Sequence, residues 1–145
     1  MADSKAKLSF SVAATGADLA LRVTLDDKII YHSEPGTEPT VITHEFDDGQ
    51  EGPHVLVFEM TGKLPSHTVL DAHGTITQDR CIMITDLAFD DIQLGHMFTE
   101  VARYSHDHNG TTEPITEAFY GVMGCNGRVT VEFSTPIYLW LLENI

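Results

Sequence analysis

The sequence predicts an all-β fold, an antiparallel β-sandwich of about nine strands with the connectivity of a jelly roll. Apolar and polar residues alternate with a period of two over several short segments, which is typical of half-buried strands. Turn residues separate these segments, and no long apolar stripe has a helical period. These three observations together favour two stacked sheets.

The elements are predicted in order from this alternation. The clearest strands are residues 8–12, 19–25, 55–60, 81–84 and 129–133. Asp26-Asp27 stands between 19–25 and the next short segment, as a two-residue hairpin turn would. Asn126-Gly127 is the stronger turn signal, because this pair suits the positive φ angles of a type I′ turn.

The chain is predicted to form a single domain over residues 1–145, a length that suits one core. Residues 105–117 are polar and lack alternation, which indicates an exposed loop. Residues 118–145 are expected to form a closing C-terminal hairpin and strand.

The C-terminal end is unusually apolar for a chain terminus. Its apolar side chains are Ile137, Tyr138, Leu139, Trp140, Leu141, Leu142 and Ile145. We expect this segment to be buried, either within its own sandwich or against a neighbouring subunit. In the second case Tyr138, Trp140 and Leu142 would be the interface residues.

The charge balance narrows the range of partners. The chain has 22 acidic and 8 basic residues and a formal net charge of −14. Nucleic acid is therefore not expected as a partner, since phosphate binding needs Lys and Arg. No apolar run is long enough for membrane insertion. The start of the sequence lacks the apolar core of a signal peptide, so we expect synthesis in the cytoplasm.

Two groups of residues are candidates for metal binding. His106-Asp107-His108 would place two imidazoles on one side of an extended strand, a spacing that can chelate a transition metal, but a solvated loop is the favoured interpretation. Asp71 and Asp79 lie in loop-like segments, where hard cations such as calcium find carboxylate and carbonyl oxygens. The alternative for such acidic residues is an outward-facing position on a turn.

Ligand binding is predicted around the 105–117 loop, which two tyrosines flank. The candidate residues are Tyr104, His106, Asp107, His108, Asn109 and Tyr120. Tyr104 and Tyr120 could be platforms on which a sugar ring stacks, or edge residues of the sandwich. The chain has neither a Gly-x-Ser-x-Gly elbow nor a glycine-rich phosphate loop, so we predict a binding or structural protein and no enzyme.

Residues 18–94 resemble the small calcium-dependent xylan-binding modules. The resemblance is carried by the hairpin ALRVTLDDKIIYHSE, the strand HVLVFEMTG and the segment from Asp79 to Ile84, with Asp71 as the upstream loop acid. It implies a sandwich in which calcium bridges protein carboxylates and sugar hydroxyls, with Asp71 and Asp79 as the carboxylates. The chain departs from the pattern at Cys81, which replaces an asparagine.

The ending FYGVMGCNGRVTVEFSTPIYLWLLENI resembles that of small virion proteins of tailed phages that infect marine cyanobacteria. This resemblance implies a structural protein of the virion, either a head decoration or a fibre-associated domain. Its partners would be other virion proteins or copies of itself.

Two hypotheses follow from these observations. The first is a phage virion structural protein that acts by binding and assembly, made in the host cytoplasm and located in the virion. The alternative is a carbohydrate-binding module, with a glycan as partner and calcium as the candidate cofactor.

Overall fold

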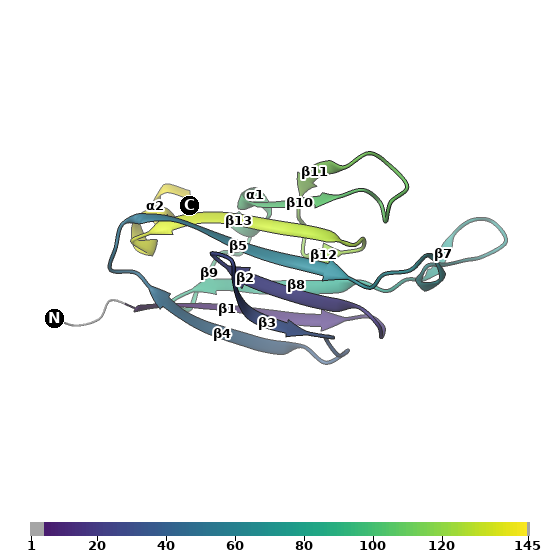
Figure 1. The fold of residues 1–145 in the computed structure, drawn as a ribbon, viewed down its shortest axis with the longest axis horizontal. Helices are drawn as coiled ribbons and strands as arrows, with labels where there is room; N and C mark the ends of the chain where they lie inside the picture. Colours follow the sequence, from purple (N-terminus) through teal and green to yellow (C-terminus); the bar gives the residue numbers. More distant parts are fainter. Residues whose placement is uncertain (1–4, 145) are drawn as a thin grey trace.

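The computed structural model describes residues 5–144, which form two antiparallel sheets packed face to face (Figure 1). The predicted all-β sandwich is confirmed. Residues 5–144 contain thirteen strands, more than the nine expected, because short strands also form within segments that show no alternation. Neither helix in this part of the chain is long and apolar enough to cross a membrane.

Sheet A contains five strands. Their order is β12 (Val122–Met123), β8 (Ile82–Phe89), β1 (Lys5–Ala14) and β4 (Thr40–Asp47), and β9 (Ile92–Gln93) pairs with the end of β8. The predicted strands 8–12 and 81–84 are the central strands β1 and β8, which lie side by side. Long apolar segments therefore occupy the middle of the sheet.

Sheet B contains six strands. Their order is β11 (Ile115–Ala118), β10 (Ala102–His106), β13 (Gly127–Thr135), β5 (Gly52–Thr61), β2 (Ala20–Leu25) and β3 (Lys28–Ser33). The remaining predicted strands, 19–25, 55–60 and 129–133, are its neighbouring members β2, β5 and β13.

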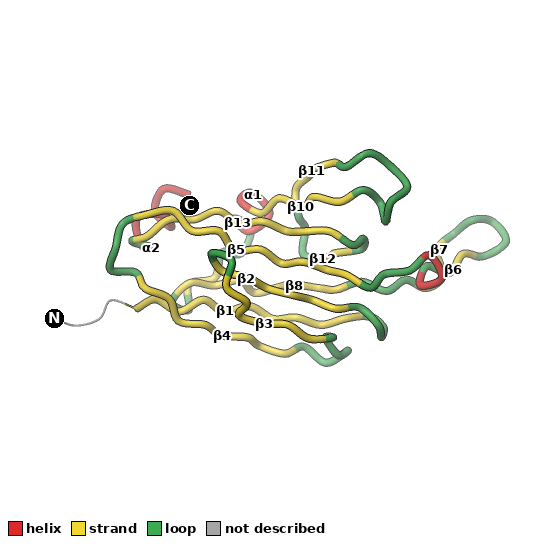
Figure 2. The backbone as a smooth tube through the Cα atoms, in the orientation of Figure 1, coloured by secondary structure: helices red, strands yellow, loops and turns green. Residues whose placement is uncertain are grey.

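The other elements lie at the two ends of the sandwich. A hairpin of β6 (Val69–Leu70) and β7 (Ile76–Gln78) projects from one end, next to a 3₁₀ turn at Pro65–His67 (Figure 2). The β10–β11 loop lies at the same end. We call this end, with residues 62–81 and 107–114, the loop end. Helix α2 (Ile137–Asn144) lies at the opposite end, and the short helix α1 (Met97–Val101) precedes β10.

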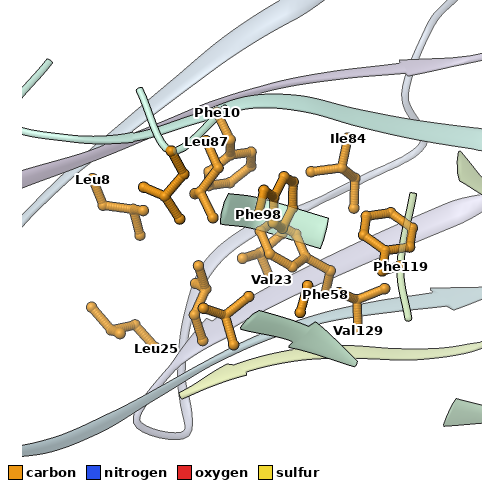
Figure 3. Packing of buried hydrophobic residues seen from close by; sticks show 14 of the residues in the cluster. Leu8, Phe10, Val23, Leu25, Phe58, Ile84, Leu87, Phe98, Phe119 and Val129 are labelled. Atoms are coloured by element: carbon orange, nitrogen blue, oxygen red, sulfur yellow. The ribbon is translucent and has the colours of Figure 1, made fainter. Parts of the chain in front are cut away.

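The core fills the space between the sheets. Leu8, Phe10 and Ile84 of sheet A face Val23 and Phe58 of sheet B (Figure 3). The rings of Phe10 and Phe58 meet edge to face, with 5.1 Å between their centroids, a favoured arrangement of aromatic pairs. The alternation read from the sequence therefore corresponds to burial between two layers.

The two hairpin predictions had different outcomes. Asp26 and Asp27 join β2 to β3 with φ angles of 50° and 68°, as a type I′ turn requires. The predicted turn at Asn126-Gly127 is wrong, because β12 and β13 belong to different sheets. Gly127 instead begins β13, where a Cβ atom would collide with the Ser105 carbonyl.

The C-terminal segment forms helix α2, and the strand expected there is a wrong prediction. Ile137, Trp140 and Leu141 are buried, and their i, i+3, i+4 spacing is the helical pattern. Tyr138 and Leu142 point to solvent. Ile145 lies outside the described residues.

Trp140 is a core residue, which corrects its prediction as an interface anchor. Its ring packs against Phe89, at a centroid distance of 5.8 Å, and against Phe133, at 6.1 Å. Helix α2 therefore closes the sandwich at this end with its buried face, and the other two predicted interface residues remain exposed.

Candidate functional site

A polar cavity of about 550 Å³ opens at the loop end, beside the projecting hairpin. It is lined by Thr15, Ser66, His67, Val69, Thr77, Gln78, Asp79 and Arg80. The structure thus places Asp79, one of the two predicted cation ligands, in the wall of a cavity. Its size is in the range of small-molecule sites.

The two carboxylate oxygens of Asp79 have different surroundings. Oδ1 accepts hydrogen bonds from Lys63 Nζ at 2.5 Å, Thr68 Oγ1 at 2.8 Å and the Arg80 N–H at 3.0 Å. Among residues 5–144, the one group that reaches Oδ2 is the Cys81 thiol, 3.8 Å away, which is a weak donor. Asp79 is therefore held firmly through one oxygen while the other keeps acceptor capacity.

These contacts also set the charge of the carboxyl group. Burial raises the pKa of Asp79, but the hydrogen bonds from Lys63 and Thr68 and the Lys63 charge outweigh burial and lower it below 3.8. Asp79 is consequently an anion at neutral pH, able to accept hydrogen bonds but not to donate one.

Lys63 is the partner that supplies the positive charge. Its side chain is 1% exposed, and its ammonium donates to Asp79 Oδ1, to the Arg80 carbonyl at 2.7 Å and to the Gly124 carbonyl at 2.9 Å. An ammonium group has three donors, and all three are used. This pairing satisfies the general requirement that a buried charge be compensated.

His67 contributes a donor to the same cavity. Its ring nitrogen Nδ1 accepts the Leu64 N–H at 3.1 Å, so a neutral ring carries its proton on Nε2. The residue is 6% exposed. Within residues 5–144 no protein group pairs with Nε2, and no fully buried side-chain nitrogen lacks a partner, so Nε2 is open to solvent. The cavity wall therefore combines a carboxylate acceptor with an imidazole donor.

Asp71, the second predicted cation ligand, does not line this cavity. It lies in the β6–β7 hairpin, where its Oδ1 accepts the N–H groups of His73 and Thr75 at 2.8 and 3.0 Å. Across residues 5–144, no three His, Cys, Asp or Glu side chains come together as a metal site. With Asp79 Oδ1 held by an ammonium group, the residues at the loop end do not fit the expected calcium ion.

The predicted residues of the β10–β11 loop mostly bind the loop to itself. His106 Nδ1 accepts the His108 N–H at 3.2 Å, and Asp107 Oδ1 accepts the Gly110 N–H at 2.7 Å. Asn109 Oδ1 accepts the Asn126 N–H at 2.9 Å. The two imidazole rings do meet, with 4.6 Å between centroids. The chelating strand geometry expected for them is absent, because His108 lies in a turn with φ of 53°.

The tyrosines that flank this loop differ from each other. Tyr104 is 5% exposed, and its hydroxyl donates to the Cys125 carbonyl and accepts the Cys125 N–H. Burial raises the pKa of Tyr104. It is a core residue and not the platform that the sequence suggested. Tyr120, in contrast, is 78% exposed.

His106 and Asp107 also line a shallow depression on the outer face of sheet B, about 400 Å³ in volume. Glu59 in its floor accepts from Arg22 at 2.5 Å and from Arg128 at 2.8 Å. These three residues lie opposite one another on β2, β5 and β13. Their cross-strand ion pairs are a common way to stabilise a sheet surface.

Asp26, His54 and Thr135 are linked in the manner of a catalytic triad. His54 Nδ1 lies 2.6 Å from Asp26 Oδ2, and Nε2 lies 3.0 Å from Thr135 Oγ1. A nucleophile must reach its substrate, but Thr135 is 2% exposed and its hydroxyl donates to the Gln50 carbonyl. The arrangement therefore joins three strand ends and presents no accessible nucleophile.

Sequence reasoning missed Lys63 and His67. Both follow β5 directly in a segment of mixed polarity, and such residues are usually exposed loop positions. Only their neighbours in the folded structure distinguish Lys63 and His67 from ordinary exposed loop residues. A pairing between Lys63 and Asp79 across 16 positions leaves no local pattern in the sequence.

Comparison with known proteins gave two structural likenesses. No family model and no curated protein sequence matches the chain. A selenomethionine form of vCBM60, from a study of two families of calcium-dependent carbohydrate-binding modules, aligns with a TM-score of 0.49 and 9% identity over 87% of this chain and 89% of that one. The vCBM60 complex with galactobiose aligns with a TM-score of 0.47 and 9% identity, covering 86% and 96%. Likenesses of this size establish neither a family nor a ligand.

Proposed function

We propose that this domain is a carbohydrate-binding module whose ligand enters the cavity at the loop end. The observation that carries the proposal is the pair formed by Asp79 Oδ2 and His67 Nε2, an acceptor and a donor with unused capacity in one cavity wall. A sugar hydroxyl both donates and accepts, so neighbouring hydroxyls of one ring suit such a pair.

The other lining residues support a polar ligand. Ser66 and Gln78 have exposed side chains with both donor and acceptor atoms, and Arg80 adds a guanidinium group that is anchored to Asp18 at 3.0 Å. Asp79 is held by Lys63, Thr68 and the Arg80 N–H, and His67 by the Leu64 N–H. Both side chains are therefore preorganised for binding, which lowers the entropic cost of association.

Isothermal titration calorimetry with soluble xylan, galactan and galactobiose tests the proposal, in buffer with calcium and in buffer with chelator. The blocking variant is Ser66→Trp, which fills the cavity from an exposed position in its lining. Gln78→Ala, which removes one amide, should weaken binding about fivefold to tenfold, as expected for the loss of one hydrogen bond.

The matched control is Glu59→Gln in the depression on sheet B. If Ser66→Trp abolishes binding and Glu59→Gln leaves it unchanged, the ligand enters at the loop end. The reverse result would move the binding site to the outer face of sheet B, and absence of binding to every polysaccharide would contradict the proposed function.

A role in assembly is the second candidate function, and the exposed side of α2 favours it. Tyr138, Leu139 and Leu142 present large apolar surfaces to solvent, and such surfaces often mark contacts between chains. The partner would be a second copy of this chain, placed helix to helix. Light scattering should then give a dimer or larger assembly that Leu142→Glu converts to a monomer. Neither the fold nor any comparison points to a virion, so the virion location stays a prediction.

A further inference from the structure

We propose that the Lys63 ammonium group replaces a structural metal ion at the loop end. It lies between the Asp79 carboxylate and the carbonyls of Arg80 and Gly124, where it supplies the positive charge that a bound ion would provide. The loop end then folds without calcium. The consequence for ligand binding, that it too is independent of calcium, rests on the proposed function.

The oxygen atoms around Lys63 come from separate parts of the chain. Asp79 and the Arg80 carbonyl precede β8, and the Gly124 carbonyl follows β12. Lys63 itself follows β5. The ammonium group therefore ties sheet B to two strands of sheet A, which is the role that a structural metal ion plays when it joins loops.

The backbone of Lys63 is also fixed in place. Its N–H donates to Asn126 Oδ1 at 2.9 Å, and its carbonyl accepts from Asn126 Nδ2 at 3.0 Å. Gly62 precedes it with φ of 93° in close contact with the Asp18 carbonyl. The position of the ammonium is consequently set by a rigid main chain, unlike that of an exposed lysine.

The geometry leaves no place for calcium on Asp79 Oδ1. Calcium binds six to eight oxygens at about 2.3–2.6 Å, whereas Oδ1 already has three donors, including an ammonium at 2.5 Å. A divalent ion bound to Oδ1 would be repelled by the positive charge of Lys63, which lies 2.5 Å from the same oxygen. The positive charge required by Asp79 is thus supplied by the protein.

Melting temperature without any sugar is the primary readout, so that the result does not depend on the proposed function. We expect the melting temperature of the wild-type protein to be the same in calcium and in chelator. Lys63→Ala should lower it by about 10–15 °C, because breaking a buried ion pair leaves a charge uncompensated.

Added n-propylammonium should restore part of that loss, since it supplies the missing carbons and the ammonium group. Propanol has the same three carbons without the charge, so it should not restore the melting temperature. Lys28→Ala is the control, because Lys28 is exposed on β3 and should show neither loss nor rescue.

Asp79→Asn keeps the test valid if Lys63→Ala does not fold. It removes the opposite charge, so it should also lower the melting temperature by about 10 °C, again with no response to calcium. A saturable increase of the wild-type melting temperature with calcium would overturn the proposal, as would a Lys63→Ala variant as stable as the wild type.

Discussion

Replacing Tyr104 with phenylalanine removes one oxygen atom and separates two roles for this side chain. As an exposed sugar platform, which the sequence suggested, Tyr104 would act through its ring, which phenylalanine keeps, and the substitution would leave stability unchanged. As a core residue, which the structure indicates, it satisfies both the N–H and the carbonyl of Cys125 through its hydroxyl. The substitution should therefore destabilise the fold.

The size of the effect follows from the two backbone groups that lose their partner. A buried donor or acceptor without a hydrogen bond costs about 1–3 kcal/mol, so Tyr104→Phe should cost about 2–4 kcal/mol of unfolding free energy. For a chain of 145 residues the unfolding entropy is about 300 cal/mol/K, and 1 kcal/mol lowers the melting temperature by about 3 °C. The expected decrease is about 7–13 °C.

Thermal unfolding followed by circular dichroism measures this decrease. Tyr120→Phe is the matched control, because the same atom is removed from a side chain that is 78% exposed. Its melting temperature should stay within about 2 °C of the wild type. If Tyr104→Phe is as stable as the wild type, the reasoning from burial is refuted.

Three further outcomes are expected. Because the folded pKa of Asp79 lies below its ordinary value of 3.8, its contribution to stability is complete well above that pH and is lost as the pH falls through the folded pKa. Urea unfolding between about pH 5 and pH 3 should therefore show a steeper loss of stability for the wild type than for Asp79→Asn, and parallel curves would contradict this. Trp140→Ala should cost about 3–5 kcal/mol in urea unfolding, against less than about 1 kcal/mol for Leu142→Ala, since only the tryptophan is in the core. Burial raises the pKa of the Cys81 and Cys125 thiols, so both should react slowly with a thiol reagent in the folded protein and rapidly in denaturant, and fast reaction of the folded protein would show that they are accessible.

The strands were predictable because alternation is a local property. In β1, β2 and β13, every second residue is apolar and buried, so each strand could be read from its own residues. The turn at Asp26-Asp27 was equally local. The Asn126-Gly127 prediction failed because the pairing of β13 with β10 and β5, and not the dipeptide itself, decides the backbone conformation there.

The candidate site was predictable only in part. Asp79 could be identified as a loop carboxylate, but its neighbours Lys63 and His67 come from a segment with no distinguishing pattern. Of the residues predicted in the exposed loop, Asp107 to Asn109 lie in it, and their hydrogen bonds are with the loop itself and with Asn126. His106 is instead the buried last residue of β10, and its Nε2 lies 3.0 Å from Glu117 Oε1 on β11. Polarity indicates where a polar side chain is exposed but not which group it contacts.

The sequence by itself therefore determined the all-β class, the main strands and the acidic character of this protein, because each depends on composition or on a period of two residues. Only the tertiary structure decided that the C-terminal segment is a helix, that Tyr104 is buried and that Lys63 neutralises Asp79. Each of these features depends on contacts between residues far apart in the chain. Such contacts form only when the fold brings the two partners together, so no local pattern in the sequence predicts them.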